Sequence, residues 1–111
     1  MDHPSTNRRK LTAPERKLLK KLIENASALD LATGWEKNLL VEPLSDGGMG
    51  SLKLIPSNAP PYRKLGGAVS RLEFEDTDGV KVSVVLNVDQ SGQLFELDIW
   101  KADFSPLTRL P

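Results

Sequence analysis

Cysteine is absent from this chain of 111 residues, and histidine occurs only once, at His3. The missing cysteines exclude disulfides, thiolate metal ligands and a cysteine nucleophile. The single histidine, in a segment that we expect to be loose, excludes histidine triads and multi-histidine metal sites. No apolar run approaches the roughly 18 residues that cross a membrane, and the start of the chain lacks a secretory signal. We therefore expect a cytoplasmic protein without metal, cofactor or membrane contact.

A net charge of either sign is also missing, because 15 basic and 15 acidic residues cancel. Their distribution is nevertheless uneven. Residues 1–21 hold seven basic and two acidic side chains, whereas residues 73–111 hold three basic and eight acidic ones. An acidic half favours association with a basic partner. The basic start could contact phosphates, but it lacks stacking aromatic residues, so we expect a solvated face there.

A helix is predicted over about residues 13–26. Thr12 and Glu15 form a capping box, in which each side chain serves the backbone N–H of the other. Apolar residues then recur at spacings of three and four, beginning with Leu18, Leu19 and Leu22. A short second turn is expected over residues 27–34, where Gly34 provides a stop.

After Trp35 the apolar pattern has period two, which predicts strands separated by turns. A four-residue loop at 89–92 would place Leu86 opposite Phe95, and a three-residue turn at 77–79 would place Phe74 opposite Val82. The predicted fold is α+β, with the helix packed on one face of an antiparallel meander of about five strands. We expect one domain over residues 1–111, with residues 1–10 loose and residues 101–111 irregular. The expected strands are 39–44, 49–55, 69–75, 80–88 and 94–100.

One glycine-rich loop is a candidate binding site. It consists of Asp46, Gly47, Gly48, Met49 and Gly50. Glycines let backbone N–H groups converge into an anion nest, but no helix follows and the phosphate-loop pattern is absent. A tight hairpin with left-handed glycines explains the composition equally well, and a binding role stays open.

Carboxylates on the outer sheet face form a second candidate site. Glu96 and Asp98 are two residues apart on a strand and share its outer face, and Asp103 and Ser83 complete the candidate. Such groups can do acid–base chemistry or bind a divalent cation, although strand alternation alone also predicts charges on a solvated face. The segment 76–79 resembles the start of a calcium loop but lacks its later glutamate and helix.

Trp100 falls on the same polar face, where an exposed tryptophan is uncommon and typical of interfaces. We expect Phe104 and Leu107 of the tail to fold back and cover it, while Lys101 and Asp103 stay in water. If the tail leaves Trp100 uncovered, Trp100 becomes the leading candidate for a partner-binding residue.

Three stretches of the sequence are familiar together: Arg9-Lys10-Leu11-Thr12 with Glu15, the segment Asp46–Leu52, and the segment Leu94–Leu107. They resemble a family of small bacterial proteins known only as a domain of unknown function. The resemblance spans about residues 8–107 and implies a bacterial origin and a stand-alone domain. It implies no activity and assigns no site residue.

These observations favour a non-catalytic protein-binding module that neutralises or regulates a partner protein with a basic surface. The candidate contact residues are Trp100, Glu96, Asp98, Asp103 and Glu73. A carboxylate-based, metal-dependent hydrolase that uses Glu96, Asp98 and Asp103 is the enzymatic alternative. A weak nucleic-acid binder, acting through the basic N-terminal helix, is the third hypothesis.

Overall fold

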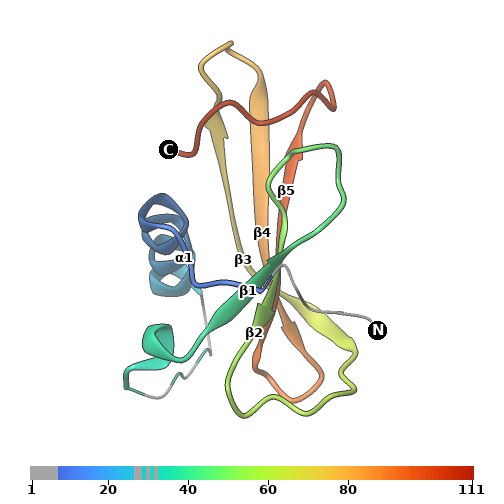
Figure 1. Ribbon diagram of the computed structural model, residues 1–111. Coiled ribbons are helices and arrows are strands. Elements are labelled where there is room, and N and C mark those ends of the chain that lie inside the picture. The colour runs from blue at the N-terminus through green and yellow to red at the C-terminus, as the bar shows by residue number, and fades with distance from the viewer. Residues whose placement is uncertain (1–7, 27–28, 30, 32) are drawn as a thin grey trace.

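The computed structural model describes residues 8–26, 29, 31 and 33–111 (Figure 1). The predicted turn over 27–34 includes residues 27, 28, 30 and 32, which lie outside this part of the chain. The described residues form one α-helix, one short 3-10 helix and a five-stranded antiparallel sheet, which confirms the α+β class. No helix in the described part is long and apolar enough to cross a membrane. The elements are α1 (Ala13–Asn25), η1 (Trp35–Lys37), β1 (Leu40–Pro43), β2 (Leu52–Ile55), β3 (Leu65–Glu75), β4 (Lys81–Asp89) and β5 (Leu94–Lys101).

The strands lie in the order β1-β2-β5-β4-β3, so only β3, β4 and β5 form the expected meander. The β1–β2 hairpin joins the free side of β5 instead of extending the sheet beside β3. Arg63 fixes the connection between β2 and β3. Its guanidinium is buried and donates to the carbonyls of Leu54 (2.7 Å) and Leu94 (2.8 Å) and to Asp89 Oδ2 (3.2 Å). This long-range anchor holds the 56–64 loop against β2 and β5.

The predicted capping box starts α1. The amide of Glu15 donates to Thr12 Oγ1 (3.3 Å), and the amide of Thr12 donates to Glu15 Oε1 (2.9 Å). Arg9 adds a bidentate contact to the Glu15 carboxylate at 2.8 and 2.9 Å. Arg9 also pairs its backbone with Val41 of β1, so this part of the expected loose segment is anchored.

The core lies between α1 and one face of the sheet, which we call the inner face (Figure 1). Leu18, Leu19 and Leu22 of α1 are almost completely buried, as the predicted stripe requires. The opposite face of the sheet, the outer face, bears the alternating polar residues of β3, β4 and β5. The inner-face core residues of the central strands are Leu52, Leu54, Val82, Val84, Leu86, Leu94, Leu97 and Ile99.

The predicted β3–β4 register is confirmed, since Phe74 pairs with Val82. The predicted β4–β5 register is wrong by two residues, because Leu86 pairs with Leu97 and not with Phe95. A shift of two keeps every side chain on its face. The cause is a bulge that leaves Phe95 unpaired, next to a turn in which the Asp89 carboxylate accepts the amides of Ser91 and Gln93. Phe95 therefore leaves the inner face.

Phe95 contacts Arg63 instead of the core. The Arg63 guanidinium lies over the Phe95 ring at 5.0 Å from its centroid, a distance within the range of a cation–π interaction. Leu94 takes the inner-face place that the sequence pattern gives to Phe95, and only 2% of its surface is exposed.

Candidate functional site

Trp100, Asp98 and Glu96 lie on the outer face of β5, as their alternation predicts. The pairing across strands places Trp100 beside Ser83 of β4, and Ser83 beside Glu73 of β3. The structure therefore brings Trp100, Asp98 and Glu73 to one region of the outer face.

The tail does not bury Trp100, and this sequence prediction is wrong. Trp100 is 52% exposed and Phe104 is 65% exposed. Their ring centroids are 5.8 Å apart with an interplanar angle of 52°, so the two side chains contact each other in water. We call them the aromatic pair. Only Leu107 turns inward as expected, since it packs against the core and its amide donates to the Gly48 carbonyl (3.0 Å).

The backbone holds Phe104 in an unusual conformation. Its φ angle is +62°, in the left-handed region, where it is the only non-glycine residue among those described. This conformation costs roughly 1–2 kcal/mol for an ordinary L-residue. A turn fixes it, because the Phe104 amide donates to the Lys101 carbonyl (2.9 Å). The turn therefore exposes a large aromatic side chain beside Trp100 and lowers the stability of the folded chain.

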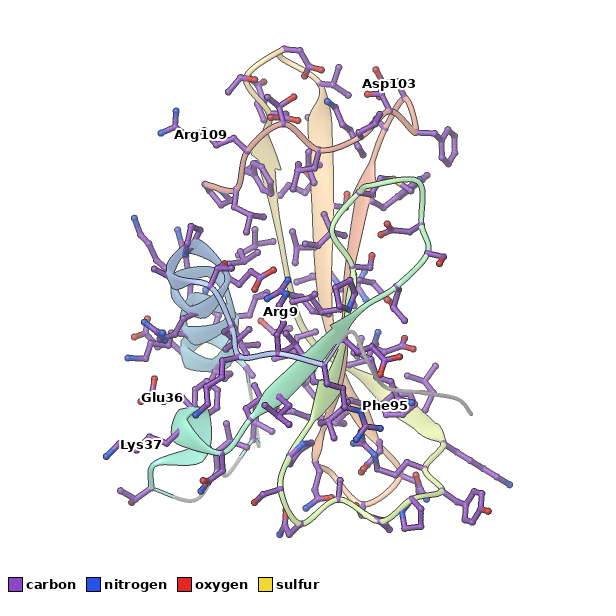
Figure 2. All side chains as sticks on the ribbon, in the orientation of Figure 1. Arg9, Glu36, Lys37, Phe95, Asp103 and Arg109 are labelled. Carbon is purple, nitrogen blue, oxygen red and sulfur yellow. The ribbon has the colours of Figure 1, made fainter. Side chains whose placement is uncertain are left out.

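Asp103 supports this turn and is not part of a carboxylate cluster. Its Oδ1 accepts from the Ser105 hydroxyl (2.6 Å) and the Ser105 amide (3.0 Å), and these bonds lower the pKa of Asp103. Figure 2 shows Asp103 beyond one end of β5 and Phe95 near the other end. Asp103 is thus separated from Glu96, the residue that follows Phe95.

Glu96 and Asp98 interact with each other on the outer face. Asp98 Oδ2 accepts from Asn87 Nδ2 (2.8 Å). Burial, followed by the negative charge of Asp98, raises the pKa of Glu96, while Lys53 on the adjacent strand opposes the shift. The described residues contain no group of three or more His, Cys, Asp or Glu side chains that could hold a metal ion. The three carboxylates of the hydrolase hypothesis are therefore not brought together.

Lys101 forms a buried ionic network that the sequence interpretation missed. Only 1% of its surface is exposed, although we expected it in water. Its Nζ donates to Asp76 Oδ2 (2.8 Å), Asp78 Oδ2 (2.6 Å) and the Pro106 carbonyl (3.2 Å). The segment that resembles a calcium loop thus holds the ammonium group of Lys101. The missed signal was the period of β5, which puts Lys101 on the same face as Leu97 and Ile99.

The network shifts the pKa values of both partners. Burial alone would raise the pKa of Asp76, but hydrogen bonds from Lys101, Thr108 and Thr77 outweigh it and hold this pKa well below its usual range. The hydrogen bonds to Asp76 and Asp78 raise the pKa of Lys101. The network ties β5, the β3–β4 turn and the tail together, directly behind the turn that presents Phe104.

The glycine-rich loop binds its own aspartate. Asp46 Oδ1 accepts the amide of Met49 (3.0 Å), and Asp46 Oδ2 accepts the amide of Ser51 (2.9 Å). Burial opposes these bonds, but they lower the pKa of Asp46. Gly47, Gly48 and Gly50 all have left-handed φ angles, as a tight turn requires. A Cβ on Gly48 would also lie 3.2 Å from Pro106 Cβ, so the tail packs directly on this loop.

Three of the seven basic side chains at the start of the chain form ion pairs within it. Arg9 binds Glu15, Lys20 lies 3.2 Å from Glu36, and Arg8 lies 3.4 Å from Glu42. In Figure 2, Arg9 lies beside β1.

Two of the clefts among the described residues lie away from the aromatic pair. One of about 400 Å³ is lined by uncharged residues that include Trp35 and Leu94. The other, of about 580 Å³, lies beside Phe95 and the proline-rich loop after β2. Neither is lined by Trp100 or Phe104.

The fold and this surface define a small α+β domain with an exposed aromatic pair on an open sheet face. The chain belongs to the family described as Domain of unknown function (DUF6984), which it matches over residues 8–111. This match confirms the family resemblance, whereas the bacterial origin stays a prediction. No curated protein and no solved structure shows significant similarity to the chain.

Proposed function

We propose that this protein is a non-catalytic binding module that neutralises or regulates a partner protein, which docks on the aromatic pair. The observation that carries the proposal is the contact between two large aromatic side chains that are both more than half exposed. Burying such a side chain fully contributes roughly 1.5–3 kcal/mol, and tryptophan is the residue type most enriched among binding hot spots.

Backbone strain at Phe104 supports a functional origin for this exposure. A bulky residue with positive φ destabilises the free protein, and strained residues persist where the surrounding structure holds them for a purpose. The turn at Phe104 is held from behind by Lys101 and from the side by Asp103. The pair is thus presented rigidly, which lowers the entropy cost of association.

The charges around the pair indicate the chemistry of the partner. Asp98 and Glu73 lie on the same outer face as Trp100, and Asp103 immediately precedes Phe104. Arg71 and Lys81 also lie on this face, so its acidic character is partial. A partner that inserts an apolar patch over the rings and sets basic residues around it would match these carboxylates.

Site-specific photo-cross-linking tests the proposal. A photoreactive phenylalanine is placed at position 104 and, as a control, at Tyr62, which is 89% exposed and remote in sequence. In cells that normally make the protein, we expect a discrete adduct with one protein from position 104 only. Trp100→Ala in the same chain should abolish it. Adducts that form equally from both positions, or from neither, would contradict the proposal.

Phe104→Gly separates binding from stability. Glycine adopts φ near +60° without strain, so we expect the melting temperature to stay equal or rise by a few degrees. Capture of the cross-linked partner by the purified variant should fall at least tenfold, as loss of a hot-spot residue implies. A variant that keeps its affinity would show that Phe104 is not a contact residue.

A further inference from the structure

The edge of the sheet at β3 has features that are independent of the aromatic pair. β3 pairs with β4 on one side, and no other described segment hydrogen-bonds with its backbone on the other side. Its first half is irregular, with register shifts between Leu65 and Gly67 and between Ala68 and Ser70. From Ser70 to Glu75 the register is continuous. The tail lies beside the end of this half, because Arg109, Leu110 and Pro111 line a hollow together with Phe74 and Glu75. The outward backbone groups of the half are still without a hydrogen-bond partner among the described residues, so they can pair with another strand.

The ladder shows which residues of β3 point their backbone groups outward. The Lys81 carbonyl accepts from the Ala102 amide (2.9 Å), so the backbone groups of Lys81 face away from β3. Glu75, the partner of Lys81, therefore points its own N–H and C=O away from β4. Because the pattern has period two, Glu73 and Arg71 do the same.

The charges on this edge are self-complementary. Arg71 and Glu73 are exposed on the outer face, and neither forms an ion pair with the described residues. Within its own sheet, Arg71 stands opposite Val85 and Glu73 opposite Ser83. If two β3 strands pair antiparallel about a two-fold axis at Leu72, Arg71 of each chain lies opposite Glu73 of the other. The outward backbone groups of these residues then form the hydrogen-bonded pairs of the ladder.

We propose that β3 is a dimerisation edge, on which a second copy of this chain adds its own β3 in the register centred on Leu72. The sheets of the two copies join into one, and both outer faces point to the same side, because the two-fold axis is perpendicular to the sheet. The pairing segment is short, so the dimer is weak and depends on concentration.

Neighbouring registers are less favourable because they oppose like charges. An axis at Arg71 would set Arg71 against Arg71, and an axis at Glu73 would set Glu73 against Glu73. Like charges directly opposite each other destabilise a strand pair. The alternating charges therefore select one register, while the two bulges prevent the pairing from extending into the glycine-rich half.

Sedimentation analysis over roughly a hundredfold range of protein concentration tests the proposal through mass action. We expect a reversible monomer–dimer equilibrium. Arg71→Glu and Glu73→Arg should each weaken it about tenfold, because each change creates symmetric pairs of like charges. The double variant Arg71→Glu/Glu73→Arg should restore the dimer, since the opposite charges are then only exchanged.

Glu75→Arg is the matched control. In the proposed register Glu75 lies opposite Val69, so this variant should dimerise like the wild type, whereas an axis at Glu73 would place Glu75 opposite Arg71. Melting temperatures of all variants, measured at low concentration, report whether the fold is intact. A wild type that stays monomeric at every concentration would overturn the proposal. So would intact single variants that dimerise normally, or a double variant that fails to recover.

Discussion

The Lys101 side chain combines two environments that sequence rules treat as exclusive. Its aliphatic stem lies in line with Leu97 and Ile99 on the inner face, while its ammonium group meets Asp76 and Asp78. A buried ammonium group without such partners would be expensive, because burial disfavours the charged form. Three acceptors from two separate segments satisfy it here. The tail is therefore held by charge as well as by Leu107.

Removing this ammonium group should be strongly destabilising. Lys101→Met leaves the buried Asp76 carboxylate without its cation, and we expect the melting temperature to fall by about 10 °C or more. Lys81→Met, at an exposed lysine on the same sheet, should change it by no more than about 2 °C. The double variant Lys101→Met/Asp76→Asn should recover part of the loss, since no unpaired charge remains. Equal melting temperatures for the two single lysine variants would contradict this interpretation.

The alternation of apolar residues in β5 predicts part of the Lys101 environment. It places residues 97, 99 and 101 on one face of β5, and Leu97 and Ile99 were assigned correctly. Lysine is almost never fully buried unless it is paired. We therefore expected Lys101 in water, although its position in the strand places it on the buried face. The pairing carboxylates come from a turn 23 to 25 residues earlier in the chain. Local sequence patterns cannot show that contact.

At the scale of the element, β4 separates the two faces of the sheet most clearly. Val84 is fully buried on the inner face, and Val85 is half-buried on the outer face. Val84→Asp places an unpaired charge in the core, and we expect it to cost at least about 3 kcal/mol. Val85→Asp should cost less than about 1 kcal/mol, because it can keep contact with water. Urea unfolding of both variants measures the difference.

Similar losses in both variants would show that the outer face is covered as fully as the inner one. A loss confined to Val84→Asp would agree with an outer face that stays open for a partner.

Elements that depend on nearby residues were predictable, and those that depend on distant ones were not. The capping box of Thr12 and Glu15 and the β3–β4 register follow from residues within one turn. The β4–β5 register was missed because the Asp89 side chain reorganises the turn and the bulge at Phe95 absorbs one residue. Glu96, Asp98 and Trp100 lie on the outer face as the alternation predicts. The turn that leaves Phe104 exposed beside Trp100 was missed, because it depends on a left-handed residue that has no local sequence signal.

At the scale of the whole molecule, ionised carboxylates lie where separate segments of the chain meet or turn. The pKa values of Glu15, Asp46, Asp76 and Asp89 are all lowered in the folded state. Burial opposes each shift, and hydrogen bonds from amides, hydroxyls or cationic side chains outweigh it. These residues join α1 to the N-terminal arm, close the glycine-rich loop, hold the tail and shape the β4–β5 turn.

Acid should therefore loosen the molecule at several places at once. Because the folded-state pKa values lie below the unfolded ones, this stability is present above about pH 4 and is lost as the pH falls through the folded-state values. Glu96 has the opposite sign, since its raised pKa favours the folded state when it is protonated, but it is one group against five, because the pKa of Asp103 is lowered as well. Calorimetry should show a melting temperature that is nearly constant at pH 5–7 and falls at about pH 3–4.

Lys101→Met/Asp76→Asn provides the control for this pH profile. Its acid dependence should be shallower than that of the wild type, because the most strongly shifted carboxylate is gone. A wild type whose melting temperature is the same at about pH 3 as at about pH 7 would show that these carboxylates are not coupled to unfolding.

The central position of β5 has a consequence for how the chain acquires its fold during synthesis. The β1–β2 and β3–β4 hairpins form from neighbouring residues, but they share no ladder until β5 is inserted between them. Since β5 follows both hairpins in the chain, a ribosome must complete the other four strands before the sheet can close. An isolated hairpin is at best marginally stable in water. The nascent chain therefore carries unpaired strand edges until β5 has emerged from the ribosome and inserted, and this is the interval in which a chaperone would have the most to protect.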